Sequence, residues 1–222
     1  MLNEIKETLI IFSRYPEAGK TKTRMIPVLG AVGAAKLQQK MTEHTINTAR
    51  KLKRSRDNLA IEVHFTGGDQ QLMADWLGKD LYYYPQVAGD LGQKMRSAFA
   101  RAFQQGNNRV VTIGTDCPDI DEKILTEAFQ ALEFMELEPI NLVLGAALDG
   151  GYYTIGLSQY SDENLLNSDW KCLFDNIAWG TDKVFQQTKD IANHLKLNTY
   201  YLPLLRDIDR PEDLEVWYLS QS

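Results

Sequence analysis

The sequence has few cysteines and histidines, and neither residue type occurs in a metal-binding spacing. Cys117 and Cys172 are the two cysteines of the 222-residue chain, which also has three histidines but no CxxC pair and no Cys/His cluster. Neither a disulfide-stapled scaffold nor a zinc site is therefore predicted. A chain without disulfides suits a reducing compartment, so we expect a cytoplasmic protein.

Long apolar runs and a general positive charge are also absent. The start of the chain, MLNEIKETLIIF, contains acidic side chains and only a very short apolar run, which matches neither a signal peptide nor a transmembrane helix. The formal net charge is -6 and the pI is near 5.2, whereas a nucleic-acid-binding domain normally carries a basic face. We therefore expect small-molecule partners rather than nucleic acid or a membrane. The sequence leaves the oligomeric state open.

The chain does contain an alternation of strand-like and helix-like segments. Its composition, with 44% hydrophobic and 24% charged residues, is ordinary for a globular protein. Segments that predict strands lie at residues 9–12, 60–65, 81–84, 109–113, 141–147, 152–157 and 200–205, with helical periodicity between most of them. We predict one α/β domain spanning residues 1–222, with a mainly parallel sheet and ligands bound outside the carboxyl ends of its strands.

Three helix starts are predicted from local signals. Asp119, with Glu122 three residues later, matches a capping pattern. Thr181 is expected to cap an amphipathic helix. Pro211 is expected to open the last helix, because proline is favoured at the first helical position.

The stretch from Thr8 to Arg24 joins a short apolar run to a loop crowded with positive charge. The loop sets four cations against Glu17 alone: Arg14, Lys20, Lys22 and Arg24. Because the chain as a whole is acidic, this local excess indicates a polyanionic ligand such as a nucleoside triphosphate or diphosphate. One cation and one phosphate charge ~4 Å apart attract by about 4 kcal/mol at an effective dielectric of 20. The alternative is an ordinary solvated surface loop.

The same loop superficially matches a Walker A motif. Gly19, Lys20 and Thr21 could end such a motif, but it requires a further glycine five residues earlier. Arg14 occupies that position, and Pro16 lies inside the supposed loop. A P-loop NTPase is therefore rejected.

Aspartates follow the later strands. Asp116 comes directly after the strand at 109–113, where a carboxylate can bind a hard divalent cation; Mg²⁺ prefers one or two carboxylates plus phosphate oxygens and waters. Asp207 and Asp209 precede Pro211 and could serve as helix caps. Alternatively, Asp209 joins Asp116 around a shared metal.

Two further loops follow strands. Asp149 stands beside Gly150 and Gly151, which would allow a ligand to approach closely, so it could bind a hydroxyl group or accept a proton. Gln86 and Asp90, the latter in the turn GDLG, follow the strand at 81–84 and suit ligand contact, with a simple turn as the alternative.

Taken in order, the motifs FSRYPEAGKTKTR, GDLGQKM, IGTDCPDI, LDGGYYTIGL, AWGTD and RDIDRPEDL resemble the radical-SAM/selenodomain-associated transferase family. This family is a branch of the nucleotide-diphospho-sugar transferase superfamily, and the chain is more distantly similar to phospholactate and molybdenum-cofactor guanylyltransferases. The resemblance implies a GT-A type, Rossmann-like fold with three α/β/α layers.

The resemblance also implies site residues. It would put Arg14, Gly19, Lys22 and Arg24 on the nucleotide phosphates, Asp116 and Asp209 on the metal, and Asp149, Gly150 and Gly151 on the acceptor side. The sequence departs from the DxD motif of glycosyltransferases, because Pro118 occupies the place of the second aspartate.

The leading hypothesis is nucleotidyl transfer that depends on Mg²⁺ or Mn²⁺. A phosphorylated acceptor would attack the α-phosphate of an NTP while Lys22 and Arg24 neutralise the departing pyrophosphate. One alternative is a glycosyltransferase with an NDP-sugar donor, a small-molecule acceptor and Asp149 as base. The other is a nucleotide-binding module without turnover.

Overall fold

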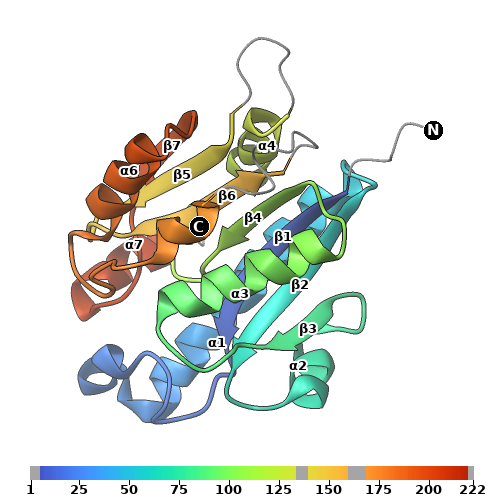
Figure 1. The fold of residues 1–222 in the computed structure, drawn as a ribbon. Helices are drawn as coiled ribbons and strands as arrows, with labels where there is room; N and C mark the ends of the chain where they lie inside the picture. Colours follow the sequence, from blue (N-terminus) through green and yellow to red (C-terminus); the bar gives the residue numbers. More distant parts are fainter. Residues whose placement is uncertain (1–5, 134–139, 160–168, 220–222) are drawn as a thin grey trace.

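The computed structural model describes residues 6–133, 140–159 and 169–219 and shows a sheet covered by helices on both faces (Figure 1). The strands are β1 (Glu7–Arg14), β2 (Leu59–Thr66), β3 (Tyr82–Pro85), β4 (Arg109–Ile113), β5 (Leu142–Ala147), β6 (Tyr152–Ser158) and β7 (Thr199–Leu205). They form a 7-stranded sheet in the order β3-β2-β1-β4-β6-β5-β7. The predicted three-layer α/β/α fold is confirmed.

The sheet is mainly parallel, as expected, and one strand is reversed. β6 runs antiparallel to both of its neighbours, β4 and β5, whereas the other pairs are parallel. Because β6 is reversed, its first residues rather than its last lie at the edge where the parallel strands end. Tyr152 is thereby brought to the same edge as the loops that follow β1, β4, β5 and β7.

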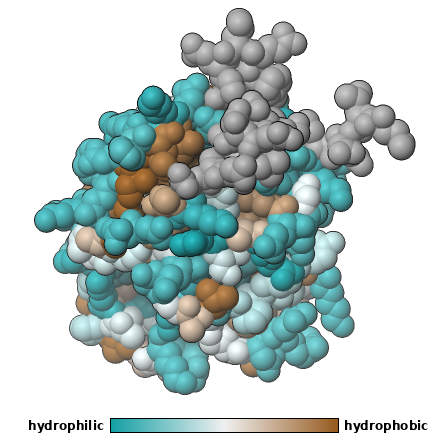
Figure 2. Space-filling model, in the orientation of Figure 1, coloured by the Kyte–Doolittle hydropathy of each residue, from teal (hydrophilic) through white to brown (hydrophobic). Residues whose placement is uncertain are grey.

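The helices divide the core into two sides. One apolar cluster joins the sheet to α1 (Ile26–Arg54), α2 (Gln70–Leu77) and α4 (Glu122–Ala131). The other joins it to α3 (Leu91–Gln104), α6 (Val184–His194) and the 3-10 helix Asp169–Phe174. A third cluster packs the start of α1 against α7 (Leu214–Leu219). The outer face in Figure 2 is mostly hydrophilic, with hydrophobic residues gathered in a few areas. Among the described residues, no helix is long and apolar enough to cross a membrane.

Several predicted boundaries are wrong in detail. β1 continues to Arg14 rather than ending at Phe12. The cap of α4 is Asp121, whose carboxylate accepts a hydrogen bond from the Ile124 amide, and not Asp119. α6 begins after Lys183, and the Thr181 hydroxyl instead donates to the Ala178 carbonyl.

The start of α1 also differs from a regular helix. Gly30 has φ 69° and ψ 167°, so the helix is interrupted there before it continues to Arg54. The last helix does begin at a proline, since Pro211 opens the short 3-10 helix Pro211–Asp213 that leads into α7.

The opposite edge of the sheet, where the parallel strands begin, is closed by a buried ionic network. Glu7 is 6% exposed and accepts hydrogen bonds from Arg109 (2.8 Å) and Arg56 (2.9 Å). Arg56 also bonds to Glu133 at 2.9 Å. This network ties the first residues of β1 and β4 to the end of α1 and to the residues after α4.

Candidate functional site

A large cleft lies at the edge where the parallel strands end. Its volume is about 1330 Å³, which exceeds the usual range for a single small-molecule pocket and leaves room for two substrates. The lining comes from the loops after β1, β3, β4, β5 and β7, from the start of α3, and from residues 179–184. The site is therefore assembled from segments far apart in the sequence.

The basic loop on one side of the cleft is held in a defined shape. Gly19 has φ 82° and Lys22 has φ 46°, so the chain turns twice through the left-handed region. The buried Thr21 hydroxyl donates to the Glu17 carbonyl at 3.2 Å, and the Arg14 guanidinium donates to the Lys20 carbonyl at 3.2 Å. Lys20 pairs with Glu17 at 2.7 Å. The loop is thus stabilised by its own polar contacts.

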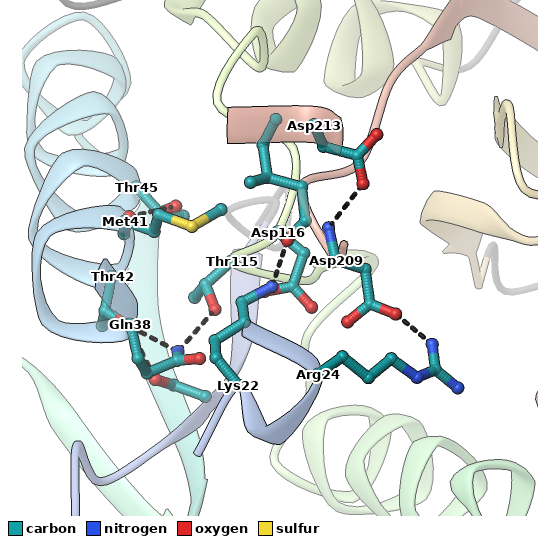
Figure 3. A network of polar contacts seen from close by, with 12 residues as sticks. Lys22, Arg24, Gln38, Met41, Thr42, Thr45, Thr115, Asp116, Asp209 and Asp213 are labelled. Carbon is teal, nitrogen blue, oxygen red and sulfur yellow. Dashed lines mark hydrogen bonds and ion pairs between the residues drawn. The ribbon is translucent and has the colours of Figure 1, made fainter. Parts of the chain in front are cut away.

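Lys22 reaches from this loop to Asp116 in the loop after β4. Its side chain is only 4% exposed, and its ammonium lies 2.9 Å from Asp116 Oδ1. It also donates to the carbonyl of Ile208. The Ile208 amide in turn donates to the Asp116 carbonyl at 2.7 Å. Lys22 therefore joins the basic loop, the loop after β4 and the loop after β7 (Figure 3). Because an ammonium carries three hydrogens, one donor is left for a ligand.

Arg24 makes a second ion pair across the same cleft. Its guanidinium contacts the Asp209 carboxylate, and the Arg24 side chain is 64% exposed. The Asp209 amide donates to Asp213 at 3.1 Å, which fixes the position of Asp209 just before α7. Figure 3 shows Lys22 and Arg24 side by side, each directed at its own aspartate.

A polar network with no formal charge supports the floor of the cleft. The Gln38 side-chain amide from α1 donates to Thr42 (3.1 Å) and to Thr115 (3.2 Å). Thr42 also bonds to the Ser13 hydroxyl at 3.2 Å. All four side chains are buried. The network links β1, α1 and the loop after β4 beside Lys22 (Figure 3).

The other side of the cleft is acidic and aromatic. Asp149 accepts a hydrogen bond from the Gly151 amide at 2.8 Å. Burial, followed by the negative charge of Asp149, raises the pKa of the Asp207 carboxyl. Trp179 packs edge-on against Tyr152, with ring centroids 6.3 Å apart. Carboxylates beside aromatic rings can accept hydrogen bonds from hydroxyl groups and pack against a ring.

Most of the predicted site residues lie together in this cleft. Its lining includes Arg14, Lys20, Lys22, Arg24, Gln86, Asp116, Asp149, Gly151 and Asp209. Three predicted residues lie outside the lining given by the described part of the chain: Gly19, Asp90 and Gly150.

Two of the predicted residues have clear structural tasks. The Asp90 carboxylate caps α3 by accepting from the Gln93 amide at 2.8 Å, within a capping box. The Gln86 side-chain amide donates to the His64 carbonyl at 2.8 Å and to the Ser13 carbonyl at 3.3 Å. Gln86 therefore ties the ends of β1 and β2 together at the rim of the cleft.

Sequence reasoning missed Trp179, Tyr152 and Lys94, which line the cleft, and did not place Asp207 in it. Trp179 stands in the motif AWGTD, where an aromatic residue directly before Gly180 was the available signal. Lys94 lies in the first turn of α3 rather than in a loop after a strand. Its position in the sequence therefore gave no signal that it lines the cleft. Burial raises the pKa of the Cys117 thiol, which makes this residue a poor nucleophile at neutral pH.

Asp116 and Asp209 present carboxylate oxygens, which are the ligand type that a hard divalent cation prefers. Their carboxylates face the cleft and are 49% and 33% exposed. Within the described ranges, no group of three or more His, Cys, Asp or Glu residues is arranged to hold a metal ion. Mg²⁺ commonly binds through one or two carboxylates and completes its shell with phosphate oxygens and waters. The donor set matches that pattern rather than an all-protein metal cage.

The family of the chain follows from its sequence. Residues 48–181, more than half of the chain, match the family described as "Uncharacterized protein conserved in bacteria (DUF2064)". The chain belongs to the DUF2064 family. No curated protein sequence matches it.

Solved structures resemble this DUF2064 protein over almost its whole length. A "putative nucleotide-diphospho-sugar transferase" from Desulfovibrio desulfuricans G20 is 29% identical with a TM-score of 0.84, over 99% of this chain and 89% of that one. A 4-diphosphocytidyl-2C-methyl-D-erythritol synthase from Anaerococcus prevotii DSM 20548 is 12% identical with a TM-score of 0.59, over 97% and 96% of the two chains.

A third structure contains ligands. Glucosyl-3-phosphoglycerate synthase from Mycobacterium tuberculosis, in complex with Mn²⁺, UDP and glucosyl-3-phosphoglycerate, is 14% identical with a TM-score of 0.53, over 98% of this chain and 76% of that one. These structures show that the DUF2064 chain has the fold of nucleotidyl and glycosyl transferases of the nucleotide-diphospho-sugar transferase superfamily.

Proposed function

We propose that the protein is a metal-dependent transferase that uses a nucleotide, and that it transfers a nucleotidyl group from an NTP to a phosphorylated acceptor with release of pyrophosphate. One observation carries the proposal. Four cations from the end of β1 and the loop after it line a cleft large enough for two substrates, and two of them, Lys22 and Arg24, contact Asp116 and Asp209. Such a pairing suits a ligand that brings a phosphate chain and a divalent cation together.

Each side of the cleft has its own task in this reaction. Arg14, Lys20 and Arg24 attract the β- and γ-phosphates, and Lys22 contributes its remaining donor. Asp116 and Asp209 would hold Mg²⁺ or Mn²⁺, which when bound neutralises charge on the phosphates. An oxygen of the acceptor phosphate forms a bond to the α-phosphorus as the bond to the β-phosphate oxygen breaks. The protein contributes positioning and electrostatic stabilisation, with no covalent intermediate.

A second candidate is glycosyl transfer from an NDP-sugar, and the acidic side of the cleft favours it. The negative charges of Asp149 and Asp207 would repel a phosphorylated acceptor on this side. A hydroxyl acceptor could instead donate a hydrogen bond to either carboxylate. Because its pKa is raised by burial and by Asp149, Asp207 is a stronger base than a free aspartate. Asp149 remains the base that the sequence predicts.

Two measurements separate these candidates. Pyrophosphate release is assayed with each of ATP, GTP, CTP and UTP against a panel of sugar phosphates, and NDP-sugar binding is measured by calorimetry with and without Mg²⁺. Nucleotidyl transfer predicts pyrophosphate release with at least one pair, and its complete absence from folded protein would count against this reaction. Tight Mg²⁺-dependent binding of an NDP-sugar without NTP binding would favour glycosyl transfer.

The variant Asp116→Ala tests for a binding module without turnover. An enzyme of either kind should lose Mg²⁺-dependent activity in this variant, whereas Asp190→Ala, a change outside the cleft lining, should retain it. Nucleotide binding of unchanged strength in Asp116→Ala, together with no turnover by the unmodified protein, would favour the module. We also propose that the protein belongs to the radical-SAM/selenodomain-associated branch and acts in the cytoplasm.

A further inference from the structure

The two carboxylates proposed as metal ligands already hold cations of the basic loop. Asp116 is paired with Lys22 at 2.9 Å, and Asp209 is paired with Arg24. A divalent cation approaching either carboxylate must therefore compete with a positive charge that belongs to the protein. The two pairs differ greatly in how easily they can separate.

The Lys22 pair is built into the fold. The side chain is 4% exposed, and its ammonium also bonds to the Ile208 carbonyl. Withdrawing the ammonium would leave a buried carbonyl without that donor, and buried acceptors that lose a partner are costly. Lys22 therefore stays in place when a ligand binds.

The Arg24 pair is exposed. The Arg24 side chain is 64% exposed and Asp209 is 33% exposed, so water can replace either partner. Arginine also has a long, flexible stem and a guanidinium that matches phosphate as well as it matches a carboxylate. Phosphates that enter the cleft can therefore draw Arg24 away from Asp209 at little cost.

The carboxylates of the described residues do not by themselves make up a metal site. No cluster of three or more His, Cys, Asp or Glu ligands occurs in the part of the chain that the structure describes, so phosphate oxygens are needed to complete the shell. Metal binding thus depends on the nucleotide in two ways: the nucleotide supplies ligands, and it removes the competing cation.

We propose that Arg24 is an exchangeable counter-ion that covers Asp209 until nucleotide phosphates take its guanidinium, so that metal and nucleotide bind together. This inference rests on the proposed nucleotide-dependent function. Before binding, Arg24 neutralises Asp209; afterwards Arg24 neutralises phosphate and the divalent cation neutralises Asp209. Because binding free energies are linked, each ligand must then strengthen the binding of the other by the same factor.

The test measures Mn²⁺ binding by electron paramagnetic resonance of the free ion, without turnover. The unmodified protein should bind Mn²⁺ weakly alone and at least about fivefold more tightly with whichever of ADP, GDP, CDP or UDP binds. Arg24→Gln should bind Mn²⁺ alone roughly two- to fivefold more tightly than the unmodified protein, the range expected for loss of an exposed ion pair. The gain should disappear in Arg24→Gln/Asp209→Asn.

Lys20→Gln is the matched control, because it removes the same charge from the same loop, and Lys20 pairs with Glu17 rather than with a proposed metal ligand. Equal Mn²⁺ affinities of Arg24→Gln and Lys20→Gln would overturn the inference, as would Mn²⁺ binding by the unmodified protein that no nucleotide strengthens. If no nucleotide binds at all, while Arg24→Gln still exceeds Lys20→Gln, the covering role of Arg24 is supported and the proposed function fails.

Discussion

Replacing Lys22 by methionine removes one buried ammonium and keeps a stem of similar length. The change breaks the 2.9 Å ion pair with Asp116 and the hydrogen bond to the Ile208 carbonyl. Bonds to charged groups contribute about 1.5–3 kcal/mol each. Two terms reduce the loss: Asp116 is 49% exposed and regains water, and the buried ammonium no longer has to be desolvated. We therefore expect the free energy of unfolding to fall by about 1–3 kcal/mol.

That loss is measurable in two ways. In a domain of this size 1 kcal/mol shifts Tm by about 2–4 °C, so Tm should fall by roughly 2–12 °C. Urea unfolding followed by circular dichroism should show a lower midpoint with an unchanged slope. Lys20→Met is the control: the Lys20 side chain is 67% exposed, and loss of its ammonium should change the free energy of unfolding by less than about 0.5 kcal/mol. If Lys22→Met were as stable as Lys20→Met, Lys22 would not stabilise the fold by joining the basic loop to the loops after β4 and β7.

Three further outcomes are expected, each measured by thermal and urea unfolding. Glu7→Gln should lower the free energy of unfolding by about 3–5 kcal/mol, because it breaks a buried ionic network. Glu133→Gln, at a side chain that is 47% exposed, should lower it by less than about 1 kcal/mol. Equal losses in the two variants would contradict the network's role. Gly150→Ala should lose about 2–5 kcal/mol, since a Cβ there would strike neighbouring backbone. Gly180 has a similar φ, but a Cβ there would meet open space, so Gly180→Ala should lower the free energy of unfolding by about 1–2 kcal/mol. Burial and nearby aspartates raise the pKa of Asp207, so its ionised form destabilises the folded protein and Asp207→Asn should raise Tm at pH 7. The Tm difference between the variant and the unmodified protein should vanish below the ordinary aspartate pKa of about 3.9. A Tm difference that grows on acidification would contradict this prediction.

The layers of the fold could be predicted because each strand carries its own signal. The runs at 9–12 and 109–113 are apolar enough to be buried on both faces, and loops that contain glycine or aspartate follow most of the strands. The reversal of β6 was also available from the sequence: only residues 148–151 separate β5 from β6, and so short a connection cannot make a parallel crossover. Caps were harder, because Asp119 and Asp121 both precede α4 and only the backbone geometry selects Asp121.

The site could be predicted as a set of residues but not as a set of contacts. Arg14, Lys22 and Asp116 were found because each lies at or after the end of a strand, and strand ends meet at one edge. The pairing of Lys22 with Asp116, and of Arg24 with Asp209, depends on side-chain reach across the cleft, which no local pattern encodes. Trp179 was missed although its motif offered a signal, because its contact with Tyr152 joins segments far apart in the sequence.

Gln86 illustrates how a structural bond limits recognition. Both hydrogens of its side-chain amide are engaged by the His64 and Ser13 carbonyls, and an amide nitrogen has no others. The side-chain oxygen is what it can offer to a ligand at the rim of the cleft. A ligand that hydrogen-bonds to the Gln86 side chain in this arrangement must therefore bring an N–H or O–H donor, because the side chain has no free donor to offer an acceptor.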